Sequence, residues 1–323
     1  MPFFKIILSE RQILATKLKD LEADGLIYDC VIIGGGIAGL QAAIQLGRYN
    51  YQVLVVDSNN GRSTLCKCYH NLLGWPKGVS GDTLRKLGRE QAEELNVHFQ
   101  QEKVKEIIKM DDIFQVKSTN NNEYQTKTLL LATGVKDNLP PFPKLQPCLG
   151  KSVFVCPDCD GYATSDKPTI VLGKGKAGVT MALALTHWTT RITYINLQES
   201  LEVALQNELL QKDIKLISSE VSEAVVKNDA FQGVILASGQ VIEAPTAFLA
   251  MGGNKVNSDL AMQLGVELEK NKHIKVDPRT KETSVKNVWA AGDVVAHSEQ
   301  VAIAMGDGVQ AAIWIHKSLK KKK

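Results

Sequence analysis

The pattern G-x-G-x-x-G occurs twice in this chain, each time directly after a short apolar run and before a helical pattern. The two copies consist of Gly34, Gly36 and Gly39, and of Gly173, Gly175 and Gly178. Glycine at these places permits a tight turn and lets backbone N–H groups approach a pyrophosphate. Each copy continues into a second apolar strand, QVLVVD or ITYIN, and so forms a βαβ unit. The chain therefore predicts an α/β fold with two Rossmann-like, three-layer dinucleotide-binding domains.

The order of the other segments predicts that one domain is inserted into the other. A length of 323 residues suits two domains. We expect an N-terminal helical extension over residues 1–28, a first domain over 29–137 and 247–323, and an inserted domain over 138–246. Four prolines between residues 140 and 147 fit the first crossing, because proline stiffens connections. The segments EIIKMDDIFQVKS and TKTLLLATG are expected to return to the first sheet as hairpin strands.

Composition and charge exclude several classes of function. The formal net charge is only +3, and no basic stripe is interleaved with aromatic residues, so binding to nucleic acid is not expected. We find neither an apolar segment of membrane-spanning length nor a signal peptide, so we expect a cytoplasmic protein without a membrane segment. Ile13, Leu14, Leu18 and Leu21 lie at helical spacing and predict an amphipathic helix, for which a surface extension is favoured over a dimer contact.

Acidic residues accompany the first glycine turn. Asp57 lies 18 residues after Gly39 (57 − 39), close to the spacing of about 20 expected for a carboxylate that binds ribose hydroxyls. Gly292 and Asp293 follow another apolar strand in AAGDVV. Asp293 could hold a hydroxyl of a bound dinucleotide, although by itself it is typical of an ordinary turn.

The second glycine turn departs from this pattern. Asp57 and Asn196 each lie 23 positions after the first glycine of their copy (57 − 34 and 196 − 173). NAD recognition usually uses a carboxylate at this place, and NADP recognition uses a nearby arginine. The segment INLQESLE contains no arginine, and Glu199 and Glu202 would repel a 2′-phosphate. The pattern disfavours NADPH, whereas NADH stays open because asparagine can hydrogen-bond a ribose hydroxyl.

The C-x-x-C of Cys156 and Cys159 fits a redox dithiol better than half of a zinc site. Zinc needs four ligands, and the other close pair, Cys66 and Cys68, is only C-x-C. We therefore expect no metal site. Asp160 directly follows the dithiol and could serve as a general acid or base in thiol exchange, or as a helix cap. Cys66 and Cys68 either pack near the cofactor or form a second redox pair, and packing is favoured.

Taken together, GGGIAG, LLLATG, CPDCDG, the second glycine turn and NVWAAGD resemble the low-molecular-weight thioredoxin reductase family from Asp29 to Leu319. The resemblance implies a homodimeric flavoprotein that binds FAD and acts on a thioredoxin-like dithiol partner. It makes residues 29–137 and 247–323 the FAD-binding domain. Residues 138–246 become an inserted NAD(P)-binding-like domain that carries the C-x-x-C.

The resemblance also assigns roles to single residues. Cys156 and Cys159 match the redox pair, with Cys156 attacking the partner and Cys159 facing the flavin, and Asp160 matches the family's acid. Gln300 and Val301 would lie beside the isoalloxazine ring. The implied FAD contacts are Gly34, Gly36, Gly39, Asp57, Asn71, Thr133, Gly134, Gly292, Asp293, Gln300 and Val301.

The departures from the family cluster at the places where it binds NADPH. The family's H-R-R and third arginine are replaced here by Asn196, Leu197, Gln198 and Glu202. Thr180 stands where the family has a glutamate after the second glycine turn, and Glu299 replaces an arginine before Gln300. The chain thus resembles a divergent branch that lacks the NADPH-binding arginines. Ferredoxin, the donor of related flavin enzymes, is the alternative electron donor.

Three hypotheses of function follow. The first is an FAD-dependent disulfide oxidoreductase that passes electrons from FAD to the Cys156–Cys159 disulfide and on to a thioredoxin-like protein, with NADPH disfavoured and NADH open. A second enzyme hypothesis is a dithiol oxidase that uses oxygen. The non-enzymatic alternative is a binding module whose partner contact depends on the flavin state, which a complete C-x-x-C-D makes the least favoured.

Overall fold

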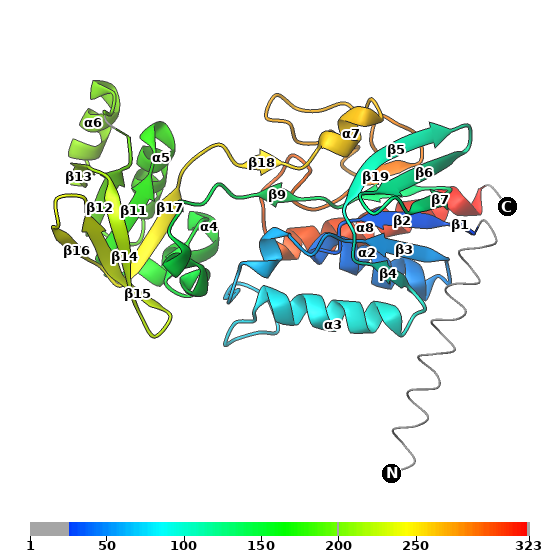
Figure 1. Ribbon diagram of the computed structural model, residues 1–323, viewed down its shortest axis with the longest axis horizontal. Coiled ribbons are helices and arrows are strands. Elements are labelled where there is room, and N and C mark those ends of the chain that lie inside the picture. Colours follow the sequence, from blue (N-terminus) through cyan, green and yellow to red (C-terminus); the bar gives the residue numbers. More distant parts are fainter. Residues whose placement is uncertain (1–25, 199, 322–323) are drawn as a thin grey trace, which may run out of the picture.

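The structure is a computed structural model that describes residues 26–198 and 200–321. The predicted N-terminal amphipathic helix lies outside the described residues. The described chain forms two lobes joined by a narrow ribbon (Figure 1). In these ranges every helix is too short or too polar to span a lipid bilayer.

The first lobe is built on a five-stranded parallel sheet whose strands are buried on both faces, except for the half-buried edge strand His98–Gln100. In spatial order its strands are β19 (Val288–Ala290), β8 (Leu129–Leu131), β2 (Cys30–Ile33), β3 (Val53–Val56) and β4 (His98–Gln100). Both faces must therefore be covered. One is covered by helices α2 (Ile37–Arg48) and α8 (Val301–Lys320), with α3 (Gly81–Glu93) packed on α2. A second, mainly antiparallel sheet covers the other.

This covering sheet corrects two expectations. Its strands, in spatial order, are β1 (Ile27–Tyr28), β7 (Glu123–Thr126), β6 (Ile113–Ser118) and β5 (Val104–Met110). The β5–β6 hairpin was expected in the first sheet. In β6, however, buried and half-buried residues alternate, and β5 buries only Val104 and Ile107, so each strand has a core face and an outer face, which suits a covering layer. Residues 27–28, expected in the helical extension, pair with β7 as a strand.

The second lobe repeats the same three layers. Its parallel sheet contains β10 (Val153–Phe154), β17 (Thr246–Ala250), β11 (Thr169–Gly173), β12 (Ile192–Asn196) and β13 (Lys215–Ser218). Helices α5 (Gly175–Leu185) and α6 (Val203–Leu210) cover one face. The antiparallel strands β14 (Val221–Lys227), β15 (Ala230–Leu236) and β16 (Val241–Glu243) cover the other. The predicted pair of three-layer Rossmann-like domains is confirmed.

The two lobes are joined by an antiparallel ribbon of β9 (Val135–Lys136) and β18 (Lys255–Val256), seen at the centre of Figure 1. The first crossing lies near residue 138, as expected. The second was expected at 246–247, and this is wrong because β17 pairs with β10 and β11 inside the second sheet. The chain leaves the second lobe only after Ala250. The short helix α7 (Asp259–Gln263) follows the ribbon.

Candidate active site between the two lobes

A cavity of about 980 Å³ lies between the lobes and brings together residues from segments that are far apart in the sequence. Nearly all of the expected catalytic and FAD-contact residues line it: Gly34, Gly36, Asp57, Asn71, Thr133, Gly134, Cys156, Cys159, Asp160, Gly292, Asp293, Gln300 and Val301. Gly39 is the exception. It lies on α2, where a Cβ atom would come within 1.9 Å of the Gly34 carbonyl oxygen, so its role is close helix–strand packing.

The first glycine turn leaves its backbone open to the cavity. Gly34 has φ +104°, and a Cβ atom on it would lie 2.4 Å from the carbonyl oxygen of Ala132. A Cβ atom on Gly36 would meet nothing within 4 Å. Because the turn precedes α2, its N–H groups and the helix dipole suit a pyrophosphate. Together with the cavity volume and Asp57, this turn fits a dinucleotide such as FAD.

Asp57 is held in place by an arginine that sequence reasoning missed. Arg85, on α3, donates from Nη2 to Asp57 Oδ2 (2.7 Å) and to Asn59 Oδ1 (2.8 Å), and from Nη1 to the carbonyl oxygen of Gly35 (2.8 Å). Arg85 therefore fixes both the carboxylate at the end of β3 and the glycine turn beside it. The 28 positions between Arg85 and Asp57 carry no motif that would connect them.

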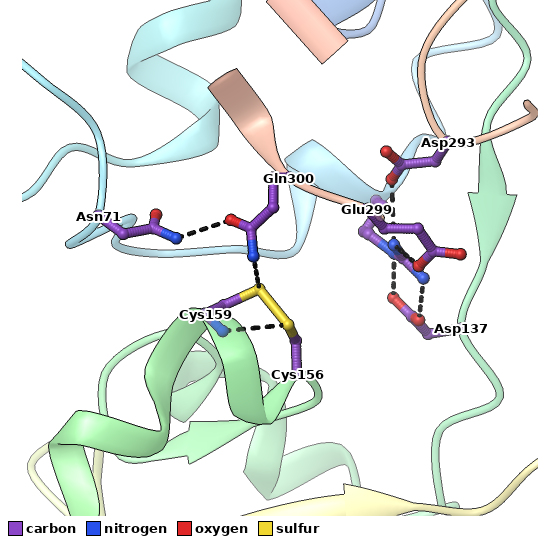
Figure 2. Close-up of a disulfide and its surroundings, with 8 residues drawn as sticks. Asn71, Asp137, Cys156, Cys159, Asp293, Glu299 and Gln300 are labelled. Atoms are coloured by element: carbon purple, nitrogen blue, oxygen red, sulfur yellow. Dashed lines mark hydrogen bonds and ion pairs between the residues drawn. A yellow bond between two sulfur atoms is a disulfide. The ribbon is translucent and has the colours of Figure 1, made fainter. Parts of the chain in front are cut away.

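A second arginine, Arg62, forms ion pairs with three carboxylates on the cavity wall. Arg62 forms a bidentate pair with Asp137 (2.6 and 2.8 Å) and contacts Asp293 Oδ2 (3.0 Å) and Glu299 Oε2 (2.5 Å) through Nη1. Burial raises the pKa of Asp293, and the Arg62 cation opposes that shift. Asp137 directly follows β9, so the cluster ties the ribbon between the lobes to the Gly292–Asp293 turn (Figure 2). Glu299, a departure from the family pattern, thus pairs with an arginine from another segment.

The dithiol is oxidised and lies against the other side of the cavity. Cys156 and Cys159 form a disulfide with a Cα–Cα distance of 5.3 Å. Cys156 caps the short helix α4 (Pro157–Asp160), and its Sγ accepts the backbone N–H of Cys159 (3.2 Å). A hydrogen bond of this kind would favour the thiolate of Cys156 after reduction.

Gln300 connects the disulfide to the first lobe. Its Nε2 donates to Cys159 Sγ (3.3 Å), and its Oε1 accepts from Asn71 Nδ2 (2.8 Å). Figure 2 shows this chain of contacts, with Cys159 nearer to Gln300 than Cys156 is. The contact comes from the residue that directly precedes α8, so the start of that helix sets the position of the amide.

Asp160 sits beside the dithiol in an environment that favours its neutral form. Burial raises the pKa of its carboxyl to about 7. The alternative of a helix cap is wrong, since the Asp160 side chain makes no capping hydrogen bond at the following turn. A carboxyl that titrates near neutrality can both give and take a proton at physiological pH.

Cys66 and Cys68 are free thiols that pack close to this site. Cys66 Sγ donates to the carbonyl oxygen of Cys68 (3.4 Å), and a Cβ atom on Gly150 would lie 2.8 Å from the same sulfur. Burial raises the pKa of Cys66 to about 12, so its thiol is protonated at neutral pH. These contacts favour packing. Within residues 26–198 and 200–321, we find no group of three or more His, Cys, Asp or Glu side chains arranged to hold a metal ion.

The second glycine turn differs from the first because the chain's own side chains occupy it. Asn196 is fully buried, and its Oδ1 accepts from the Gly175 backbone N–H (3.1 Å) and from Tyr194 Oη (3.0 Å). Its Nδ2 donates to the carbonyl oxygens of Gln198 and Ser200 (3.2 and 3.4 Å). Asn196 therefore has no hydrogen-bonding atom left for a ribose. A Cβ atom on Gly175 would lie 2.8 Å from Gln198 Oε1, so Gln198 covers this turn.

Comparison with known proteins identifies the family. Residues 28–308 match the model of the pyridine nucleotide-disulphide oxidoreductases. The chain belongs to this family. It is 29% identical over 296 residues to a thioredoxin reductase of Treponema pallidum, covering 88% of this chain and 95% of that protein. A 34.2 kDa protein in the rubredoxin operon of Clostridium pasteurianum is 30% identical over 300 residues, or 90% and 96% of the two chains.

Solved structures of thioredoxin reductases have the same fold as this chain. The crystal structure of thioredoxin reductase from Streptococcus pyogenes superposes with a TM-score of 0.82 at 25% identity, covering 92% of this chain and 100% of that one. The expected resemblance to low-molecular-weight thioredoxin reductases is confirmed, and the chain is an FAD-dependent oxidoreductase of that kind. The family uses FAD and a nicotinamide cofactor, and the open first turn fits the FAD.

Proposed function

We propose that this protein passes electrons between FAD and the Cys156–Cys159 disulfide and then to a thioredoxin-like dithiol protein, with NADPH not serving as its donor. The observation that carries the proposal is the hydrogen bond from Gln300 to Cys159, because it sets the disulfide against the wall of the cavity that fits FAD. A disulfide with only a structural role would have no need of contact with the opposite lobe.

The first lobe would hold the cofactor. The open turn at Gly34–Gly36 would bind the pyrophosphate, and Asp57, fixed by Arg85, would bind the ribose. FAD, when bound, supplies two-electron redox chemistry to the disulfide. Thr133, Gly134, Gly292 and Asp293 line the same cavity and would complete the binding site.

The dithiol would react with its partner by thiol exchange. The Cys156 thiolate attacks one sulfur of the partner disulfide; a Cys156–partner disulfide forms, and the other partner sulfur leaves as a thiolate that takes up a proton. Cys159 then attacks Cys156 Sγ, which restores the Cys156–Cys159 disulfide and releases the partner with two more electrons. Asp160 is the proton donor for the leaving sulfur. Tyr162, 82% exposed and three residues after Cys159, offers an aromatic contact to the partner.

The second glycine turn supports a donor other than NADPH. The hydrogen-bonding atoms of the Asn196 side chain all bind groups of the protein itself, and Gln198 covers Gly175. The exposed Glu202 carboxylate would repel a 2′-phosphate. A reduced ferredoxin-like protein is the donor we propose, since it needs no nucleotide site.

An anaerobic titration of the purified flavoprotein tests the donor. Flavin absorbance is followed while NADPH, NADH and chemically reduced ferredoxin are added in turn. We expect ferredoxin to bleach the flavin and NADPH to leave it oxidised. Rapid bleaching by micromolar NADPH would overturn the assignment of the donor. Bleaching by NADH alone would replace ferredoxin with NADH. In a separate aerobic assay, reoxidation of the flavin by oxygen coupled to closure of an added dithiol would reverse the direction of electron flow.

A further inference from the structure

A buried carboxylate on α8 connects two segments that enter the cavity. Asp307 is 5% exposed, and its Oδ2 accepts from the backbone N–H of Gly292 (3.2 Å) and contacts His297 Nε2 (2.6 Å). Its Oδ1 pairs with Lys281 Nζ (2.7 Å). Burial alone would raise the pKa of Asp307, but the hydrogen bonds from His297 and Lys281 outweigh it and lower the pKa. Asp307 is therefore an anion that needs cations beside it.

Both ring nitrogens of His297 face hydrogen-bond acceptors. Nε2 lies 2.6 Å from the Asp307 carboxylate, and Nδ1 lies 2.9 Å from the carbonyl oxygen of Ser298. A neutral imidazole has one N–H and can satisfy only one of these acceptors, whereas the imidazolium has two and satisfies both. The Asp307 hydrogen bond also raises the pKa of His297. The charged groups that face His297 are Asp307, Lys281 and Asp293.

The position of His297 connects the protonation of its ring to the geometry of the site. His297 begins the segment that carries Glu299, which pairs with Arg62, and Gln300, which contacts Cys159. Through Asp307, the same ring is connected to the Gly292 turn on the cavity wall. A change at His297 would therefore move both the amide at the disulfide and the carboxylate beside Arg62.

We propose that His297 is a proton-dependent positioning residue: as an imidazolium it anchors residues 297–300 to Asp307 and holds Gln300 against Cys159. Loss of its proton leaves one N–H for two acceptors, so the ring can no longer bind both Asp307 and the Ser298 carbonyl oxygen, and its hold on residues 297–300 is weakened. The inference rests on the proposed function only in that Gln300 serves the disulfide and flavin, since the hydrogen bonds of His297 do not depend on which donor or partner is used.

The test uses the oxidised holoprotein, so that neither donor nor partner enters. The ring nitrogens of ¹⁵N-labelled His297 are followed by NMR from pH 5 to 10, and the fluorescence of bound flavin is followed over the same range. Because Asp160 also titrates near neutrality, both measurements are made in an Asp160→Asn background. We expect a doubly protonated ring at neutral pH and a flavin transition with the same midpoint as the ring.

Two variants separate positioning from mere stability. His297→Gln should abolish the flavin transition, and His297→Arg, which keeps the charge and two donors, should hold the acid-form fluorescence at every pH. His187→Gln, on the exposed surface of the second lobe, should leave the transition unchanged. A singly protonated His297 at pH 6, or an unchanged transition in His297→Gln, would overturn the proposal. The NMR titration needs no substitution at His297, so it decides even where His297→Gln folds poorly. Failure of electron transfer to thioredoxin would leave these results intact and count only against the proposed function.

Discussion

Nε2 of Gln300 lies 3.3 Å from Sγ of Cys159, and the two residues are 141 positions apart in the chain. One belongs to the first lobe and the other to the second, so this hydrogen bond exists only while the dithiol rests against the cavity. Gln300 is in turn held by Asn71. The pair therefore defines the arrangement of the lobes in which electrons can pass between disulfide and cofactor.

Replacing Gln300 with leucine should slow reduction of the disulfide by the reduced flavin. A neutral hydrogen bond contributes about 0.5–1.5 kcal/mol, so we expect a rate lower by roughly 2- to 10-fold. Stopped-flow absorbance of the prereduced protein measures this step. Gln310→Leu, on helix α8 that follows Gln300 but outside the cavity lining, is the matched control and should match the parent rate. Equal rates in the two variants would contradict a role for Gln300.

The two cysteines should behave differently toward a partner disulfide. In Cys159→Ser, Cys156 can attack oxidised thioredoxin, but no thiol remains to resolve the product. We expect a stable mixed disulfide on a non-reducing gel, and little or none from Cys156→Ser. Adding Cys66→Ala and Cys68→Ala to Cys159→Ser should leave the trapped product unchanged, because Cys66, with a pKa raised to about 12 by burial, is almost entirely protonated at pH 7 and does not act as the nucleophile. The reverse pattern of trapping would exchange the roles of the two cysteines.

Asp160 should give thiol exchange a pH dependence centred near 7. Burial raises its pKa to about 7, so the carboxyl can donate a proton below that pH and loses this ability above it. In the parent, the rate of thiol exchange should fall about tenfold per pH unit above 7. In Asp160→Asn the rate below pH 7 should be about 100-fold lower than in the parent, and this fall around pH 7 should be absent. Asp158→Asn, an exposed neighbour on the same helix, is the control.

The same shift predicts a stability effect with a definite sign. The folded-state pKa of Asp160 lies above the value of about 3.9 for an unfolded aspartate, so its contribution to stability is full below pH 4 and is lost as pH rises through 7. Urea unfolding should therefore show that Asp160→Asn loses less stability than the parent between pH 4 and pH 8. A greater loss in the variant would mean that the carboxyl is ionised in the folded protein.

Arg62 should be essential for the cavity wall. Arg62→Met leaves three carboxylates facing one another, and removing one partner of a buried ion pair costs about 3–5 kcal/mol. Because Arg62 is one-fifth exposed, we expect a loss of about 2–3 kcal/mol in unfolding free energy, together with release of flavin on dialysis. Adding Asp137→Asn should restore part of the loss. Arg89→Met, whose partner Glu93 is about half exposed, should cost less than about 1 kcal/mol.

The parts of the site that the sequence predicts are those fixed by local geometry. The turn at Gly34 requires residues without a Cβ atom, and Asp57 follows the next strand at a set distance, so spacing alone identifies them. Cys156 and Cys159 close a disulfide within one turn of chain. Each of these patterns lies within about 25 residues of sequence.

The parts that the sequence misses depend on long-range pairing. Arg62 pairs with Asp137 and Asp293 across 75 and 231 positions, and an isolated arginine at the start of a short 3-10 helix carries no sign of such partners. The domain boundary at 246 fails for a related reason. Strand β17 is buried on both faces, as are β2, β3, β8 and β19 of the first sheet, so its apolar pattern suits either lobe. The role of His297 likewise depends on the contacts of its ring with Asp307 and with the Ser298 carbonyl oxygen, which the sequence does not predict.

The second glycine turn should be convertible toward NADPH if its own side chains are what disfavour the nucleotide. Gln198→Arg removes the amide that covers Gly175, and Glu202→Arg replaces a repelling carboxylate. Together they add two cations where a 2′-phosphate would lie. We expect the affinity for NADPH, measured by calorimetry, to rise by at least about tenfold, because one charge-assisted hydrogen bond contributes about 1.5–3 kcal/mol. The affinity for NADH should change little, because NADH lacks the phosphate. Gln211→Arg with Glu208→Arg, at exposed positions on and after α6, is the matched control for added charge and should leave both affinities unchanged. An equal gain for NADH would mean that the arginines act by general attraction rather than by binding the phosphate. No gain at all would place the obstacle in the buried contacts of Asn196.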